Sequence, residues 1–217
     1  SIYFYDPNNF GFAVGKSFTM LNEGGALVDL FWRDDTGISC SLVHHQRQMM
    51  VIAPDIDGTE LDVIKLVDKS LIITLNNPTS GKIISLNTSA NGDLLYGISD
   101  SVDHHLIVWD IKTGNILSRM KLTDGTFSKC HVNPLDPLQV ALVGSNGITI
   151  VNIVEVLGEY NSKAFVLDIE ISPGVTTSTT ENILITTNTT APILSMCWMT
   201  YKSIVVGSNQ GYLTHYY

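Results

Sequence analysis

The sequence predicts an all-β fold built from a repeated unit of short antiparallel strands. Apolar residues make up 44% of the 217 residues and charged residues only 15%, and Ile, Val, Leu and Thr gather in short runs that favour strands. Asp, Asn, Gly and Pro separate these runs at short intervals, as expected of tight turns. Similar runs also recur at a nearly regular spacing, which indicates a repeat architecture.

The first 37 residues are expected to form strands, but their register is not evident from the sequence. Residues 2–5 alternate in polarity and end at a turn cluster, Asp-Pro-Asn-Asn. Residues 12–21 are the expected next strand. A break at Gly24 and Gly25 then precedes an apolar run over residues 26–32.

From residue 38 onward the strands become regular. The expected strands are 38–44, 49–53, 60–66, 69–75, 82–87, 94–98, 106–111, 116–122, 127–133, 139–144, 148–156, 164–171, 193–199, 204–207 and 212–216. They divide the chain into units at 1–37, 38–81, 82–126, 127–192 and 193–217. The segment 172–180, SPGVTTSTT, has neither an apolar period nor charge and is expected to be an insertion within the fourth unit.

The repeat period is measured by aligning the second strands of the units. Ile52, Gly97, Gly144 and Gly207 occupy equivalent places in MMVIAP, LLYGIS, ALVGSN and IVVGSN, at steps of 45, 47 and 63 residues. A period of about 40–45 residues is typical of propeller blades, and the insertion accounts for the long third step. A β-sandwich is the alternative with short strands and frequent turns, but it does not require VGSNG and VGSNQG to recur after matching strands.

The most informative stretch is 94–122, three apolar runs separated by DSVD and KTGN. Its middle run ends in Trp109-Asp110, with Asp103 six residues before the Trp and Gly114 just beyond. This pattern, D-x-x-L-x-V-W-D followed by a T-G turn, resembles the signature of a WD40 propeller blade. The resemblance implies structural roles, with Asp103 in a tight turn, Trp109 packed between blades, and Asp110 capping the turn that ends at Gly114.

Three longer segments resemble the cilia- and flagella-associated branch of the WD-repeat proteins. They are GDLLYGISDSVDHHLIVWDIKTGNIL, FSKCHVNPLDPLQVALVGSNGITIVNI and ILSMCWMTYKSIVVGSNQGYLTHY, within residues 92–156 and 193–216. The Gly-His pair that precedes the inner strand in many WD40 blades is absent. Segment 172–180 has no counterpart in that branch, and the first eighty residues match it only in strand rhythm.

This resemblance implies a non-enzymatic scaffold in complexes on doublet microtubules beside inner dynein arms. The expected fold is a partial propeller of about four blades, or part of a larger seven-bladed ring. One route to closure has residues 2–5 supplying the outer strand that is missing after 212–217, which would hide exposed strand edges. The alternative function is a cytosolic WD40 adaptor, such as a ubiquitin-ligase or trafficking subunit. An enzyme built on a propeller is a third reading.

No catalytic, cofactor or metal site is predicted. Asp55, Asp57, Glu60 and Asp62 suggest a calcium loop, but an EF-hand counted from Asp55 would need Gly where Glu60 stands and Glu where Leu66 stands. A hairpin turn explains this segment better.

The histidine pairs 44–45 and 104–105 do not suggest a metal site, because neighbouring strand residues point to opposite faces. The glycine-containing loops 144–147 and 207–211 lie between strands and lack the helix N-terminus that binds phosphate. They are expected to be hairpin turns. No Ser-His-Asp arrangement or nucleophile elbow is evident, so the chain is not expected to be an enzyme.

Charge and cysteine content narrow the expected partners. The net charge is −9, and the 12 basic residues form no cluster, which disfavours nucleic acid and anionic membrane surfaces. Cys40, Cys130 and Cys197 are widely spaced and form no C-x-x-C pair, which fits a reducing compartment. The stretch SIYFYDPNNFGF has no basic region followed by an apolar run, so it is not expected to be a signal peptide, and no apolar run approaches about 20 residues. A cytoplasmic location is therefore expected. The family resemblance implies, within it, the axoneme of a cilium or flagellum, with microtubule- or dynein-associated proteins as partners.

Overall fold

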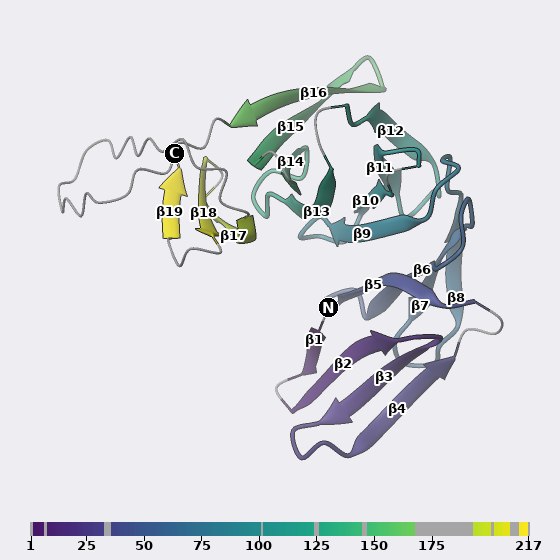
Figure 1. Ribbon diagram of the computed structural model, residues 1–217. Helices are drawn as coiled ribbons and strands as arrows, with labels where there is room; N and C mark the ends of the chain where they lie inside the picture. Colours follow the sequence, from purple (N-terminus) through teal and green to yellow (C-terminus); the bar gives the residue numbers. More distant parts are fainter. Residues whose placement is uncertain are drawn as a thin grey trace.

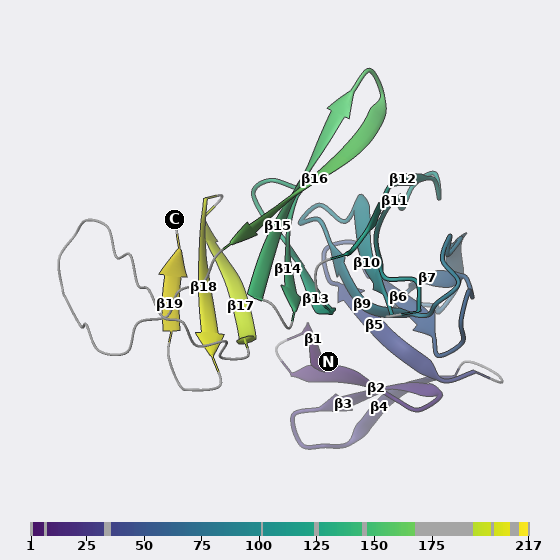
Figure 2. The same ribbon diagram turned by 45° about the horizontal axis from the view of Figure 1, so that its top comes forward.

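The chain forms a series of antiparallel sheets set side by side along an arc. The structure is a computed structural model that describes residues 2–6, 8–32, 36–100, 102–123, 126–144, 147–167, 193–200, 202–208 and 213–216. In this part of the chain, five sheets follow one another from the N-terminal strands to the C-terminal ones (Figures 1 and 2). The described residues include no helix long and apolar enough to cross a bilayer.

Each sheet is formed by consecutive strands, and we number the sheets as blades 1 to 5. Blade 1 contains β1 (Ile2–Asp6), β2 (Asn9–Val14), β3 (Ser17–Asn22) and β4 (Leu27–Trp32). Blade 2 contains β5 (Ile38–His44), β6 (Met49–Pro54), β7 (Leu61–Lys65) and β8 (Leu71–Leu75). Blade 3 contains β9 (Ile83–Thr88), β10 (Leu94–Ser99), β11 (His105–Asp110) and β12 (Ile116–Lys121).

Among the described residues, blade 4 has four strands and blade 5 has three. Blade 4 contains β13 (Phe127–Val132), β14 (Gln139–Gly144), β15 (Gly147–Val156) and β16 (Glu159–Leu167). Blade 5 contains β17 (Ile193–Thr200), β18 (Ser203–Ser208) and β19 (Leu213–Tyr216). In every blade the chain moves from one strand to its direct neighbour, so the sheets are simple meanders.

The hydrophobic core lies between the blades. Because sheets cover both of their faces, the second strands of the inner blades are largely buried, and all six residues of β6 are buried. Separate apolar clusters join blades 1 and 2, 2 and 3, 3 and 4, and 4 and 5. The first strands of the middle blades also lie side by side, β5 against β9 and β9 against β13. A single blade therefore has no core of its own.

The number of blades corrects the expectation of about four blades or a seven-bladed ring: the described residues form five sheets. The first 37 residues are the cause. Residues 12–21, expected as one strand, belong to two strands, β2 and β3, that a turn divides at Gly15, whose φ is +58°. This extra turn gives blade 1 four strands.

Two further expectations are corrected at the ends of strands. β1 pairs with β2 as the first strand of blade 1, so it does not complete the sheet of β19. The fourth strand of blade 4 begins at Glu159, before the expected start at 164, because a turn at Leu157 and Gly158 follows β15 directly. Segment 172–180, expected as an insertion, lies outside the described residues.

Candidate functional site

Trp109 joins blade 3 to blade 2. The side chain is fully buried, and its Nε1 donates a hydrogen bond of 2.8 Å to the carbonyl oxygen of Asn76, which follows β8. The ring covers Gly97 on β10, where a Cβ atom would lie 2.8 Å from the nearest ring carbon. Only glycine leaves room for this approach. The structure thus places the Trp of the WD motif in the core between two blades.

Asp103 lies in the turn before β11 and connects this turn to the 76–82 loop, which leads from blade 2 to blade 3. Its carboxylate accepts a hydrogen bond of 3.2 Å from the Ser80 amide, and it lies 3.0 Å from Nδ1 of His105. The 76–82 loop stands where a Gly-His pair precedes the inner strand in many WD40 blades. Here Asn77 holds the loop instead, donating 2.9 Å to the Gly81 carbonyl oxygen and accepting 3.1 Å from the Thr79 amide.

Asp110 closes the turn between β11 and β12. Its carboxylate accepts hydrogen bonds of 2.9 Å from the Lys112 amide and 2.9 Å from the Thr113 hydroxyl. The Gly114 amide donates 2.8 Å to the Asp110 carbonyl oxygen, and Gly114 has φ of +74°, which suits glycine. In the described structure, the contacts of all four motif residues hold turns of the blade or pack it against its neighbour.

An aromatic side chain donates a hydrogen bond to a backbone carbonyl at every junction between consecutive blades in the described structure. The pairs are Tyr3 with Ser41 between blades 1 and 2, Trp109 with Asn76 between blades 2 and 3, Tyr96 with Pro137 between blades 3 and 4, and Trp198 with His131 between blades 4 and 5. The Trp198 bond is 2.9 Å long. These bonds fix the register of one sheet against the next.

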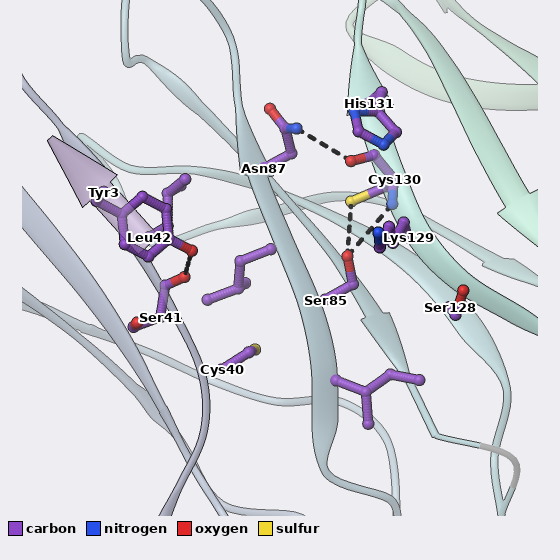
Figure 3. Close-up of a pocket in the computed structure, with 12 residues that line it drawn as sticks. Tyr3, Cys40, Ser41, Leu42, Ser85, Asn87, Ser128, Lys129, Cys130 and His131 are labelled. Carbon is purple, nitrogen blue, oxygen red and sulfur yellow. Dashed lines mark hydrogen bonds between the residues drawn. The ribbon is translucent and has the colours of Figure 1, made fainter. Parts of the chain in front are cut away.

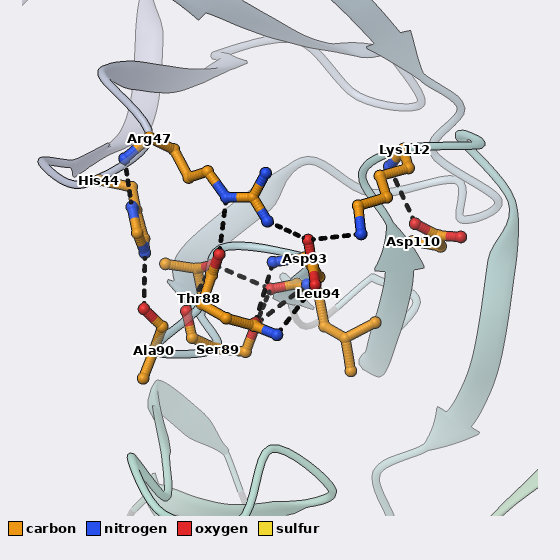
Figure 4. Close-up of polar contacts among 10 residues, drawn as sticks. His44, Arg47, Thr88, Ser89, Ala90, Asp93, Leu94, Asp110 and Lys112 are labelled. Carbon is orange, nitrogen blue, oxygen red and sulfur yellow. Dashed lines mark hydrogen bonds and ion pairs between the residues drawn. The ribbon is translucent and has the colours of Figure 1, made fainter.

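A charged bridge joins three loops (Figure 4). Arg47, in the turn between β5 and β6, contacts the carboxylate of Asp93 and donates 2.8 Å from Nε to the carbonyl oxygen of Asn91. Nζ of Lys112 lies 3.1 Å from the same carboxylate. Asp93 thereby ties the loop between β9 and β10 to a loop of blade 2 and to the next hairpin of its own blade.

The first strands of blades 1 to 4 surround a cavity of about 290 Å³. Figure 3 shows its polar side chains and the bonds among them. Cys40 and Cys130 line the cavity, and burial raises the pKa of each thiol to about 12. Ser85 Oγ lies 3.7 Å from Cys130 Sγ and accepts 3.2 Å from the Cys130 amide. Both thiols stay protonated at neutral pH, and a protonated thiol is a poor nucleophile.

A second cavity of about 300 Å³ lies where blades 3, 4 and 5 meet. Its lining residues are Asn87, Thr88, Ala90, His131, Val132, Pro134, Met196, Cys197 and Trp198. The buried Nε2 of His131 has no hydrogen-bond partner in the described part of the chain. Burial, followed by the charge of Lys129, lowers the pKa of His131, so the imidazole is uncharged at neutral pH.

The four carboxylates of the segment that suggested a calcium loop, residues 55–62, do not converge on one point. Asp55 forms an ion pair of 2.6 Å with Lys82 of the next blade, and Asp62 accepts 3.3 Å from the Thr74 hydroxyl on β8. Asp57 and Glu60 are exposed.

The buried histidines of the two pairs bond within the protein. His44 Nε2 lies 3.2 Å from the Ala90 carbonyl oxygen, and His105 bonds Asp103. Across the described ranges, no group of three or more His, Cys, Asp or Glu side chains is placed to hold a metal ion.

Sequence reasoning missed the contacts that cross between blades. The bridge of Arg47, Asp93 and Lys112 has no local pattern, and Tyr3 and Tyr96 carry no motif. Trp198 stood in a family-like segment, but its partner, the His131 carbonyl, is 67 residues away. The described arrangement is a rigid frame that presents loops, without an assembled catalytic group.

Among the comparisons with known proteins, the one with solved structures supports the propeller fold. No protein-family model matches the chain, and no curated protein matches it. Among solved structures, the β-propeller domain of Cps50 (Swd1) from Myceliophteria thermophila superposes with a TM-score of 0.61 at 13% sequence identity. The match covers 84% of this chain and 52% of that one, so the chain spans about half the length of the solved domain. At this identity the likeness shows the fold alone, a β-propeller, of which the described residues form five blades.

Proposed function

We propose that this chain is a non-enzymatic protein-interaction scaffold of the ciliary or flagellar axoneme. The scaffold role is supported by the propeller frame, in which inter-blade hydrogen bonds and the Asp93 bridge hold several loops at fixed positions. Binding residues lie preferentially on loops that a rigid scaffold positions. A fold alone does not establish a function or a location in the cell. The axonemal part of the proposal therefore rests on a separate observation.

The axonemal location is supported by the three segments within residues 92–156 and 193–216 that resemble the cilia- and flagella-associated branch. On this proposal the partners are microtubule- or dynein-associated proteins. A net charge of −9 gives a partner surface rich in Lys and Arg an electrostatic advantage in association.

Fractionation of a ciliated cell tests the location. The endogenous protein is tagged, axonemes are isolated, and they are washed with high salt. Retention on the doublets is the expected result, because a structural component should survive screening of its surface charges. Recovery from the soluble cytosol alone would contradict the axonemal location.

Proximity labelling separates the proposal from a cytosolic adaptor. Tubulin and dynein-arm neighbours are expected for an axonemal scaffold. Ubiquitin-ligase or coat subunits as the main neighbours would instead assign the chain to an adaptor role outside cilia, while leaving the propeller and its binding role unchanged.

A further inference from the structure

Lys129 and His131 lie on the same face of β13, beside the cavity between the first strands of blades 1 to 4. Pairing between β13 and β14 is regular from Lys129 to Val132, so alternate residues share a face. Cys130 and Val132, which alternate with them, belong to the apolar cluster between blades 3 and 4. Lys129 and His131 both line the cavity, and Figure 3 shows them on either side of Cys130 along the strand. β13 therefore brings two basic side chains to one cavity.

The lining of this cavity, as far as the described residues form it, contains no carboxylate. The same holds for the second cavity, which shares Asn87 and His131 with the first. The chain as a whole has 21 Asp and Glu but only 12 Lys and Arg. Lys129 is the one Lys or Arg among the described lining residues. It is exposed, so an anion that approaches from solvent meets a positive charge and no fixed negative one.

His131 has an unused hydrogen-bonding atom where the two cavities meet. Its Nε2 is buried, and no described residue bonds it. Leaving a buried polar atom without a partner costs free energy. A bound group that supplies the partner removes this cost.

Asn87 on β9 adds a further donor. Its side-chain amide has two N–H groups, and one of them donates 3.0 Å to the carbonyl oxygen of Cys130. The amide oxygen accepts 2.8 Å from the backbone amide of Thr88. These two bonds hold the amide nitrogen toward β13, as Figure 3 shows. The second N–H is not used by the described residues.

An oxyanion is the ligand class that fits this set of groups. The lysine ammonium and the asparagine N–H can only donate, and a protonated imidazole donates from both nitrogens. Hydrogen bonds from charged donors to carboxylate or phosphate oxygens are stronger than neutral ones. The cavity volume of about 290 Å³ lies at the lower end of the range for small-molecule pockets, about 300–1,000 Å³. The ligand should therefore be small.

We propose that Lys129, His131 and Asn87 form a binding site for an oxyanion, the phosphate or carboxylate group of a small ligand. In the bound state His131 is protonated and donates from Nε2, Lys129 supplies a second positive charge, and Asn87 donates its second amide hydrogen. This inference goes beyond the proposed scaffold role and rests neither on that role nor on the axonemal location.

Uptake of a proton is the signature of this site. Without a ligand, burial and then the charge of Lys129 lower the pKa of His131. A bound anion favours the protonated ring and raises that pKa. Affinity for the anion therefore increases as the pH falls from about 7 to about 5.5, by at most about tenfold per pH unit.

The remaining titratable groups of the two cavities do not produce this signature. They are Tyr3 on β1, Cys40 on β5, Cys130 on β13 and Cys197 on β17; β9 contributes none. Thiols and phenols stay protonated below about pH 7. A proton that the site takes up in this range therefore belongs to His131.

The test follows the ring of His131 by NMR in the full chain. The chain is titrated with sulfate, which mimics phosphate without changing its own charge in this pH range, and separately with acetate. Chloride keeps the ionic strength constant, which separates binding from screening. The signal is assigned by its loss in His131→Gln. We expect the pKa of His131 to rise. A rise with sulfate alone assigns the site to phosphate groups, and a rise with acetate alone assigns it to carboxylates. No rise with either ion would overturn the proposal.

Two lysine variants test the role of Lys129. Lys129→Gln should weaken anion binding by about tenfold or more, because a charged donor is lost. It should also raise the pKa of His131 in the anion-free chain, since the charge of Lys129 lowers it. Lys121→Gln is the matched control, because Lys121 is an exposed lysine on β12 that lines neither cavity. Equal binding by Lys129→Gln and wild type, or an equal loss in Lys121→Gln, would contradict the site.

His131→Gln tests the linkage to protons. Trp198 bonds the carbonyl oxygen of residue 131 and not its ring, so this variant keeps the contact between blades 4 and 5. Binding of sulfate or acetate to it should be weaker than to the wild type and should no longer increase as the pH falls. The same increase in the variant would assign the proton to another group and overturn the role of His131.

Discussion

Single residues in this propeller act mainly by fitting one blade against the next. Trp109 does so from blade 3, where its indole ring occupies the space that a side chain at position 97 of the neighbouring strand would need and reaches a carbonyl oxygen of blade 2. The sequence marked both positions through the repeat alignment and the WD motif. Their mutual contact was not evident, since strand patterns do not reveal which side chain covers which backbone.

Replacing Gly97 by alanine tests this contact. The added Cβ would lie 2.8 Å from a ring carbon of Trp109, so we expect a loss of about 1–3 kcal/mol in the free energy of unfolding from overpacking. Urea denaturation measures it. Gly24→Ala is the control, because its Cβ would meet only Asn22 at 3.4 Å in an exposed turn. Equal stability of the two variants would show that the ring is free to move aside.

The two buried thiols predict a dependence of stability on pH. The folded pKa values of Cys40 and Cys130, about 12, exceed the ordinary value of 9.0, so the folded state holds these protons more tightly than the unfolded state. The contribution is full below pH 9 and is lost as pH rises toward about 12. We expect the free energy of unfolding to fall across this window, by at most about 1.4 kcal/mol per pH unit for each thiol. In Cys130→Ser, the free energy of unfolding, measured at several pH values, should fall less steeply with pH. An unchanged dependence on pH would contradict the assignment.

At the scale of elements, loops and strands differ in how well the sequence predicted them. Strands from β5 to β14 were predicted within one or two residues, because turn residues such as Asp57-Gly58 and the KTGN segment mark their ends. The loops were predicted only as turns. Their positions relative to one another depend on contacts such as the Asp93 bridge, which joins elements 46 residues apart in sequence.

Neutralising Asp93 tests the bridge. Asp93→Asn removes the partner of both Arg47 and Lys112. The bridge is partly exposed, so we expect a loss of stability of no more than about 1 kcal/mol. The loss should shrink in 1 M salt, where the screening length is about 3 Å. Asp57→Asn, at an exposed position, provides the control for removal of one negative charge. A loss of the same size in high salt would show that the carboxylate acts through hydrogen bonds alone.

At the scale of the whole molecule, stability is shared between neighbouring blades. Because each apolar cluster belongs to two blades, the middle blades are held on both sides and blade 5 is held by blade 4. Repeat proteins of this kind gain stability from nearest-neighbour interfaces. Loss of one such interface should therefore loosen the two blades that share it more than the rest of the described blades.

Hydrogen exchange measures how far the loss of one interface between blades spreads along the chain. Trp198→Phe removes the bond from blade 5 to the His131 carbonyl oxygen, and we expect faster exchange in β17–β19 with little change in β6. Trp109→Phe, the companion variant, should instead speed exchange in blades 2 and 3. If either substitution speeds exchange uniformly along the chain, the blades unfold as one cooperative unit.

The sequence by itself determined the all-β class, the blade period and most strand ends. These follow from short-range physics: strand alternation, turn chemistry and the repeat of apolar runs. Tertiary structure decided the rest. It fixed the number of blades among the described residues through the turn at Gly15, the partners of Tyr3, Tyr96 and Trp198, and the extension of the β15–β16 hairpin beyond the end of β14. Each depends on packing between segments distant in sequence, and no local pattern records such packing.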